Sequence, residues 1–384
     1  MMTPKRLTYL SPAALQVASG NLVGTTVKLA IDRTWPLEEI IVLMDIRAHG
    51  TPLSTLTCDG VLKLLKRANL SINDGIQPRS AVDFTGPGLL EYSLHAGINL
   101  GPGTMECIRA TIAATLVASS YYRIGYRIPL VHPIITEPLR TRMLCDVNNH
   151  PQDPVLTLDF GTTAEMAGAG TQCTVELADV ILVRRQVSRE LNDRILKDGG
   201  YIKSDLIETA FQIGTGVSGE QRWQVPTPGQ YANLLLRHYK GGAAVTRNDV
   251  SETLTLGSET RWRLESGGVV IHDWRNKHIQ ELNSYSRVLN SADQTYSPNP
   301  GEAYAAATLY QDPAHVMLDF LSDGVNGNQP ANELGSLLDC NLPTNSGLKM
   351  EVIGSVASVA TNGSTLYIGG QRFFGDLSRW QALA

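Results

Sequence analysis

The sequence predicts an all-β fold with a few inserted helices, built as two tandem β-sandwiches. Three observations predict it. Apolar and polar residues alternate with a period of two in many short runs, glycine-containing turn signals separate the runs, and the succession of runs repeats in the two halves of the chain. With 384 residues, of which 42% are hydrophobic, the chain is long enough for more than one core.

Alternation with a period of two places one face of a strand on a core and the other toward water or a neighbour. In the run from Leu348 to Val352, the residues Leu348, Met350 and Val352 share one face, while Lys349 and Glu351 share the other. Turn signals such as Asn-Asp-Gly and Gly-Gly lie between such runs. The same pattern predicts strands at 26–32, 39–46, 61–72, 122–131, 155–160, 174–184, 202–213, 231–239, 261–271, 316–321, 348–352 and 365–368.

Helix signals are fewer. Capping residues and glycine or proline punctuation predict short helices at 11–18, 88–96 and 274–282. The third of these would begin after Asp273 as its cap. Residues 105–119 fit either a strand or a helix, because their β-branched side chains favour a strand while their apolar spacing also suits a helix.

An internal repeat defines the predicted domains. The same succession of a polar stretch, a loop, a strand, a second loop and a second strand closes each half, and it sets Asp159 against Glu351, 192 positions later and half of 384. Earlier, a strand followed by a helix occurs in both halves at a similar offset. We therefore expect an N-terminal arm with a short helix at 1–20, a first sandwich at 21–187 and a second at 188–384.

Composition excludes several classes of protein. Acidic residues outnumber basic ones 37 to 32, a net charge of −5 that is too mild for a protein wrapped around a polyanion. Charged residues make up 18% of the chain, against about 25% in an ordinary globular protein. This low charge on a large chain suggests that much of the surface meets other protein. Collagen, coiled coil and intrinsic disorder are excluded by the same composition.

The cysteines and the hydropathy of the chain indicate the cellular compartment in which it is made. The five cysteines are scattered, with no CxxC spacing, so neither a disulfide framework nor a zinc knuckle is indicated. Small buried thiols in a reducing compartment are the expectation. No uncharged apolar stretch approaches 18 residues, and no run of signal-peptide length follows Lys5 and Arg6. We expect a chain made in the cytoplasm.

Motifs of catalysis and cofactor binding are weak. Residues 214–219 match GxGxxG, but two prolines follow where a dinucleotide-binding loop needs a helix, so a glycine loop between strands is expected. Ser218 lacks the GxSxG pattern of a nucleophile elbow. The basic residues Arg184, Arg185 and Arg189 have no interleaved aromatics, so we expect a solvated or interfacial edge and no sequence-specific nucleic-acid binding. The sequence therefore predicts no enzyme.

Two metal sites were weighed. His272, His278 and Glu281 resemble a barrel metal site only loosely, because the close His-x-His pair is absent. An oxygen-rich loop carries Asp323 and Asn326, which suit calcium although the spacing fits no EF-hand. Turn formation by Asp, Asn and Gly explains the same residues. We predict no cofactor, and calcium at Asp323 and Asn326 is the one metal site that we name as a candidate.

An aromatic cluster leaves two readings open. It consists of Trp223, Tyr231, Tyr239, Trp262, Trp274 and Tyr285. These side chains could form the core of a sandwich and its rim. Exposed together on one face, they would instead form a sugar-stacking shelf.

With these features the chain resembles the double jelly-roll major capsid proteins of tailless icosahedral bacteriophages. The resemblance covers the whole chain through pattern and length, without a diagnostic motif. It depends on three features of the pattern. The strand at 122–131 is followed by two prolines, and the closing strand pairs are 155–160 with 174–184 and 348–352 with 365–368. The strand–helix pairs are 61–72 with 88–96 and 261–271 with 274–282.

The resemblance implies the fold and the function. The fold would be two tandem jelly-roll β-sandwiches, a double jelly roll. Three copies would form a homotrimer whose six jelly rolls make a pseudo-hexagonal capsomer, and these capsomers would tile the icosahedral shell of a virion. The resemblance further implies contacts with neighbouring capsomers and with minor capsid or penton proteins. The arm at 1–20 would reach an internal viral membrane where one is present.

Two other functions remain open. A carbohydrate-binding or receptor-binding β-sandwich, such as a spike or adhesin, would use the aromatic cluster as its shelf. An enzyme with a jelly-roll or cupin-like site would need the histidines brought together. Two measurements distinguish these functions. They are the number of chains in the assembly in solution and the change in melting temperature when sugar is added.

Overall fold

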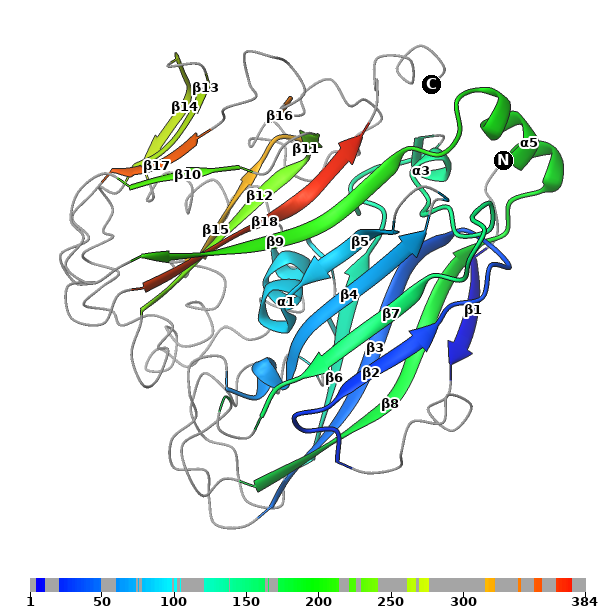
Figure 1. The fold of residues 1–384 in the computed structure, drawn as a ribbon, viewed down its shortest axis with the longest axis horizontal. Coiled ribbons are helices and arrows are strands. Elements are labelled where there is room, and N and C mark those ends of the chain that lie inside the picture. The colour runs from blue at the N-terminus through cyan, green and yellow to red at the C-terminus, as the bar shows by residue number, and fades with distance from the viewer. Residues whose placement is uncertain are drawn as a thin grey trace. The chain divides into compact units, whose positions relative to one another are not determined.

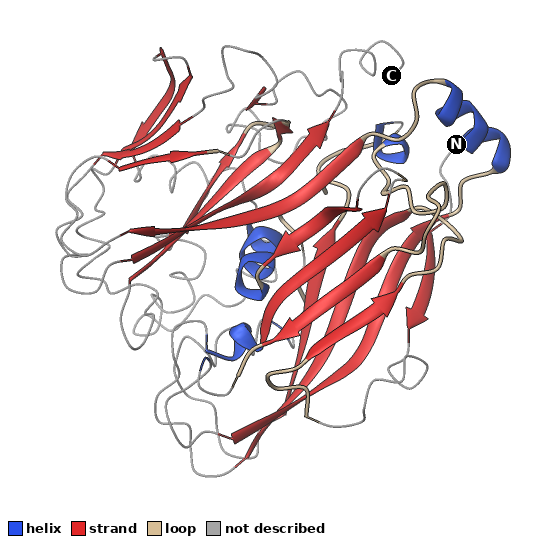
Figure 2. Cartoon of the chain, viewed as in Figure 1, coloured by secondary structure: helices blue, strands red, loops and turns tan. Residues whose placement is uncertain are grey.

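The structure, a computed structural model, describes the better part of the chain (Figures 1 and 2). It describes residues 5–10, 21–213, 221–240, 261–275, 315–321, 338–339, 349–353 and 364–374, apart from gaps at 50–59, 74, 76–77, 99, 102–103, 105–120, 138, 163–164, 166–171, 226–228 and 267–268. The chain divides into two compact units, with the boundary between Ile207 and Glu208.

The first unit contains a four-stranded antiparallel sheet and four antiparallel strands of a ten-stranded sheet, visible as two layers of arrows in Figure 1. One has the strand order β1-β8-β3-β6 and the other the order β2-β7-β4-β5. Their strands are β1 (Lys5–Leu10), β2 (Thr26–Ala30), β3 (Leu37–His49), β4 (Leu65–Asn73), β5 (Pro78–Phe84), β6 (Tyr121–Pro129), β7 (Val155–Phe160) and β8 (Gln172–Arg185).

The second unit repeats this plan. One sheet has the order β9-β18-β12-β15 and the other the order β10-β17-β13-β14, and the short strands β11 and β16 pair beside β18. The strands are β9 (Lys203–Ile213), β10 (Gln221–Gln224), β11 (Gln230–Tyr231), β12 (Asn233–Lys240), β13 (Arg261–Ser266), β14 (Val269–Arg275), β15 (His315–Asp319), β16 (Leu338–Asp339), β17 (Lys349–Ile353) and β18 (Ser364–Phe374).

The two units match strand by strand. The strands of each unit can be numbered from one to eight in chain order, leaving out β11 and β16. In both units one sheet then has the strand order 1-8-3-6, and the other has the order 2-7-4-5. The match extends to single residues: Asp159 pairs with Arg67 across β7 and β4, and Glu351 pairs with Arg263 across β17 and β13. The predicted offset of 192 between Asp159 and Glu351 is therefore confirmed.

Alternating burial builds the core of the first unit. Along β7, Leu156, Leu158 and Phe160 are buried while the residues between them are partly exposed. On the opposing sheet, Ile40 and Val42 of β3 are fully buried. Burying one such side chain contributes about 1.5–3 kcal/mol, so the facing apolar rows hold the two sheets together.

Helices are few and short. The helix α1 (Gly86–His95) confirms the expectation at 88–96: Thr85 caps it by accepting a hydrogen bond from the Gly88 amide (3.2 Å), and Pro87 occupies its first turn. It packs against β4 and β6, one strand from each sheet, and against the 3-10 helix η2 (Gly60–Leu64). The others are α3 (Leu139–Arg142) and α5 (Arg189–Lys197). No described helix has the length and apolar character needed to cross a membrane.

The linker after β8 belongs to the first unit. The predicted boundary between 187 and 188 lies twenty residues earlier than the observed one (207 − 187). The Ile202 amide donates to the Arg142 carbonyl (2.8 Å), the Ser204 hydroxyl donates to the Leu130 carbonyl (3.2 Å), and Arg79 forms an ion pair with Asp205. These contacts hold α5 and the start of β9 to the first jelly roll.

The predicted arm at 1–20 is corrected at residues 5–10. These residues form β1, which pairs with β8 from Lys5 opposite Arg185 to Leu10 opposite Val180. The first sandwich therefore begins at Lys5, because its eight-stranded plan needs a strand at this edge. The predicted helix at 11–18 and the ambiguous segment at 105–119 lie outside the described residues.

Other differences concern individual strands and one helix in both units. The expected single strand at 261–271 is a hairpin of β13 and β14, and β14 continues to Arg275. A helix beginning at Trp274 is therefore wrong, because Trp274 pairs with Trp262 in this hairpin. Two strands were missed: β5 starts with a proline, and β10 has the polar sequence Gln-Arg-Trp-Gln, so neither shows clean alternation.

Candidate functional site

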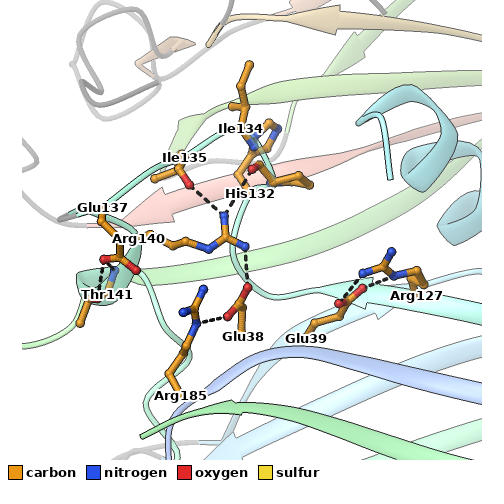
Figure 3. A network of polar contacts seen from close by, with 11 residues as sticks. Glu38, Glu39, Arg127, His132, Ile134, Ile135, Glu137, Arg140, Thr141 and Arg185 are labelled. Atoms are coloured by element: carbon orange, nitrogen blue, oxygen red, sulfur yellow. Dashed lines mark hydrogen bonds and ion pairs between the residues drawn. The ribbon is translucent and has the colours of Figure 1, made fainter. Parts of the chain in front are cut away.

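A network of buried charges ties β3 to β8 and to α3 (Figure 3). The Glu38 carboxylate accepts a hydrogen bond from Arg140 (2.6 Å) and another from Arg185, and its side chain is only 4% exposed. Arg140 also donates to the Ile135 carbonyl at 2.8 Å. A carboxylate shared by two guanidinium groups avoids the cost of an unpaired buried charge, so the network holds the chain beyond β6 on the end of the sheet.

The neighbouring Glu39 points to the other face of β3 (Figure 3). It forms a paired contact with Arg127 of β6, with an Nη2–Oε2 distance of 2.6 Å. Further along the same two strands, Arg123 binds Asp45 through both carboxylate oxygens at 2.7 and 2.8 Å. This face of the sheet thus carries ion pairs on β3 and β6, and the hydrogen bonds from Arg123 hold the pKa of Asp45 below its usual value.

Arg184 and Arg185 do not form the exposed basic edge that we expected. Arg184 is 1% exposed and donates to the Trp35 carbonyl (2.9 Å) and the Asp32 carboxylate (3.0 Å), while Arg185 binds Glu38. Adjacent strand residues point to opposite faces, and here each face supplies an acid. Of the three predicted basic residues only Arg189 is exposed, with 94% of its side chain accessible.

The second unit contains a corresponding buried charge. Arg237 of β12 donates to the Glu208 carboxylate (3.0 Å from Nε) and to the Tyr239 hydroxyl (2.6 Å). Its guanidinium also lies over the Tyr367 ring, 4.7 Å from the ring centroid. Buried pairing of this kind fixes the register of β9, β12 and β18.

The aromatic cluster does not assemble a shelf from the residues described. Tyr231, Trp262 and Tyr239 are 1%, 3% and 4% exposed, so they belong to the core. The side chains of Trp223 and Trp274, and the whole of Tyr285, lie outside the described residues. The sandwich-core reading of Tyr231, Tyr239 and Trp262 therefore holds.

The predicted metal sites fall largely outside the described residues. Asp323, Asn326, His278 and Glu281 are not described, and His272 lies on β14. Among the residues that are described, no group of three His, Cys, Asp or Glu side chains could hold a metal ion. The GxGxxG stretch is also outside, and the segment following it at Gln221–Gln224 is a strand rather than a helix. Burial raises the pKa of the Cys145 thiol to about 12, which leaves it protonated and unreactive at neutral pH.

Comparison with known proteins rests on structure alone. No protein-family model and no curated protein matches the sequence. The major capsid protein of Sulfolobus Turreted Icosahedral Virus superposes with a TM-score of 0.58 and 15% identity, over 99% of both chains. The PBCV-1 protein VP54 gives 0.56 and 12% identity over 98% of this chain and 96% of its own, and the Faustovirus major capsid protein gives 0.56 and 10% over 97% and 90%.

This chain has the double jelly-roll fold. At such low identity the likeness establishes the fold and carries no side-chain roles across. The two jelly rolls agree with that assignment independently, because each has the same eight-strand order. The sequence reasoning missed the buried ion pairs, since the acid and base in each come from positions far apart in the chain, such as Glu38 and Arg185.

The double jelly roll leaves strand edges that can join other chains. β1 and β6 end one sheet of the first jelly roll, and β10 and β14 end one sheet of the second. Unpaired edges present backbone amides and carbonyls that a further strand can bind. At the start of β14, Val269 and Val270 are 67% and 44% exposed, which places apolar side chains at an edge.

Proposed function

We propose that this chain is a major capsid protein, three copies of which form a pseudo-hexagonal capsomer of an icosahedral virion shell. One observation carries the proposal: two jelly rolls of identical strand order lie in one chain. A threefold axis acting on two similar bodies generates six similar bodies around a ring. Such a ring tiles a surface as a hexagon would.

The composition and the network support a structural role. A tile buries wide side faces against its neighbours, and obligate interfaces commonly exceed about 2,000 Å². The low charged fraction of 18% suits such faces. The buried charges Glu38 and Arg237 are used in ion pairs that brace the sheets. We assign the chain no catalytic role.

Light scattering coupled to size-exclusion chromatography tests the proposal. A trimer of 41.7 kDa chains has a mass of about 125 kDa. We expect that mass in solution, and hexagonal tiles in electron micrographs of the assembled particle. A chain that stays monomeric at every concentration and is absent from purified particles would refute the proposal.

Partners other than the chain itself follow from the same function. We propose contacts with neighbouring capsomers and with minor capsid or penton proteins. Of the predicted arm at 1–20, residues 11–20 follow β1, and this segment would contact an internal membrane where one is present. Co-flotation with lipid vesicles, lost when residues 11–20 are replaced by a glycine–serine linker of equal length, is the expected result. That the virus is a tailless bacteriophage stays a prediction from the sequence resemblance.

A further inference from the structure

The fifth strands of the two jelly rolls have different outer edges. In the first unit, Val82 and Asp83 of β5 pair in parallel with Leu206 and Ile207 at the start of β9. In the second unit β14 occupies the place of β5 and ends its sheet. In the part of the chain that the structure describes, β14 pairs only with β13.

Strand register aligns the two fifth strands. Arg67 of β4 and Arg263 of β13 are equivalent through their pairing with Asp159 and Glu351. Two residues further along, Asn69 pairs with Asp83 of β5, and Glu265 pairs with Val270 of β14. Val269 and Val270 therefore correspond to Val82 and Asp83, the residues of β5 that β9 covers.

The side chains at this edge also favour burial in an assembly. Val269 is 67% exposed and Val270 is 44% exposed, and both lie on the terminal strand of their sheet. Proteins usually protect open edges with charge, proline or a covering segment, because apolar edges recruit other strands. Val269 and Val270 supply neither charge nor proline.

We propose that β14 of one subunit is extended by β1 of the next, paired in parallel as β5 is with β9. The strand that covers β5 is β9, the first strand of the second jelly roll. By the same order, the strand that covers β14 would be the first strand of the first jelly roll of another subunit. That strand is β1, which ends its own sheet and pairs there only with β8 among the described residues.

Each chain offers one β1 edge and one β14 edge. The resulting contact is head-to-tail, and a head-to-tail contact that closes forms a ring. Three chains joined in this way close a ring that contains three copies of the proposed junction. This inference rests on the proposed capsid function, and it names the strands that would join the subunits of the capsomer.

Charge at the β14 edge tests the proposal. We expect V269D/V270D to convert the trimer of about 125 kDa to the 41.7 kDa chain, measured by light scattering. The matched control is L196D, which changes an apolar residue of α5 that is 42% exposed, and it should remain trimeric. All three side chains involved are exposed, so circular dichroism spectra should match the wild type.

Photo-crosslinking identifies the partner strand. With p-benzoylphenylalanine at position 269, irradiated trimers should yield a crosslinked peptide containing residues 1–10. Trimers mixed from light chains and ¹⁵N-labelled chains should show that the two peptides come from different subunits. A crosslink to another region, or one within a single chain, would overturn the proposal.

The two proposals fail in different ways. A wild-type chain that is monomeric and absent from particles contradicts the capsid function itself. A wild-type trimer that survives V269D/V270D leaves the capsid function standing and rules out the β1–β14 junction.

Discussion

Arg237 and Glu208 form an ion pair in which each side chain is only 2% exposed. The pair joins the first and third strands of the second jelly roll, which are separated in their sheet by β18. Tyr239 and Tyr367 add a hydrogen bond and ring contacts to the same guanidinium. The pair thus spans three strands from one buried position.

Breaking this pair on one side should be costly. We expect R237M and E208Q each to lower the free energy of unfolding by about 3–5 kcal/mol, because each leaves a buried group without its partner. The free energy of unfolding of the double variant should fall by clearly less than the sum of the two single losses. Urea unfolding measures all three, and strictly additive losses would contradict the coupling.

Glu38 and Glu39 allow a matched test of the network in the first jelly roll. E38Q should lower the free energy of unfolding by about 3 kcal/mol, because it leaves Arg140 and Arg185 as buried cations that share no carboxylate. E39Q should cost about 1 kcal/mol or less, because its partner Arg127 is 29% exposed. Equal losses in denaturant unfolding would show that the Glu38 network does not brace the sheet.

Two glycines differ in what surrounds them. A Cβ at Gly86 would lie 2.0 Å from the Leu65 backbone oxygen, whereas at Gly125 it would lie 3.3 Å from the end of the Leu43 side chain. We expect G86A to cost about 2–3 kcal/mol and G125A about 1 kcal/mol or less, since a side chain can move and a backbone oxygen of β4 cannot. Thermal unfolding of both variants measures the difference, and a fully stable G86A would contradict this close approach.

Asp45 should make stability depend on acid. Hydrogen bonds from Arg123 lower the pKa of Asp45 from its ordinary 3.8, so its contribution is present above that value and is lost as the pH falls through the lower folded-state pKa. The gap in unfolding free energy between wild type and D45N should be under about 1 kcal/mol near neutral pH, because Arg123 is 54% exposed. The gap should close at the acid end of a pH series of urea unfolding curves, and one that widens there would contradict the assignment.

Calcium binding by Asp323 and Asn326 stays a prediction from the sequence. A bound ion stabilises the folded chain by mass action, about 2.7 kcal/mol when its concentration is one hundred times the dissociation constant. We expect a higher melting temperature in calcium than in chelator for the wild type, and no difference for D323A/N326A. Identical melting of the wild type in both conditions would remove calcium from the account.

The sequence by itself determined the all-β class, the repeat and most of the strands. Period-two alternation is a local property of the chain, so strands such as β7 were predicted at their observed bounds. The predicted correspondence between Asp159 and Glu351 is confirmed because both residues lie on the seventh strand of a jelly roll. The helix α1 was readable because its cap and proline are neighbours in the chain.

Only the tertiary structure decided which strands lie at the sheet edges and which buried charged residues pair with one another. β1, β5 and β10 lack clean alternation, and their places are set by partner strands distant in sequence, such as β8 for β1. From the sequence, Arg185 is expected to lie at a solvated or interfacial edge, because its partner Glu38 is 147 positions away in the chain. Periodicity reports which face of a strand is apolar, whereas strand order and ion pairing depend on which segments meet, and that is a property of the folded chain.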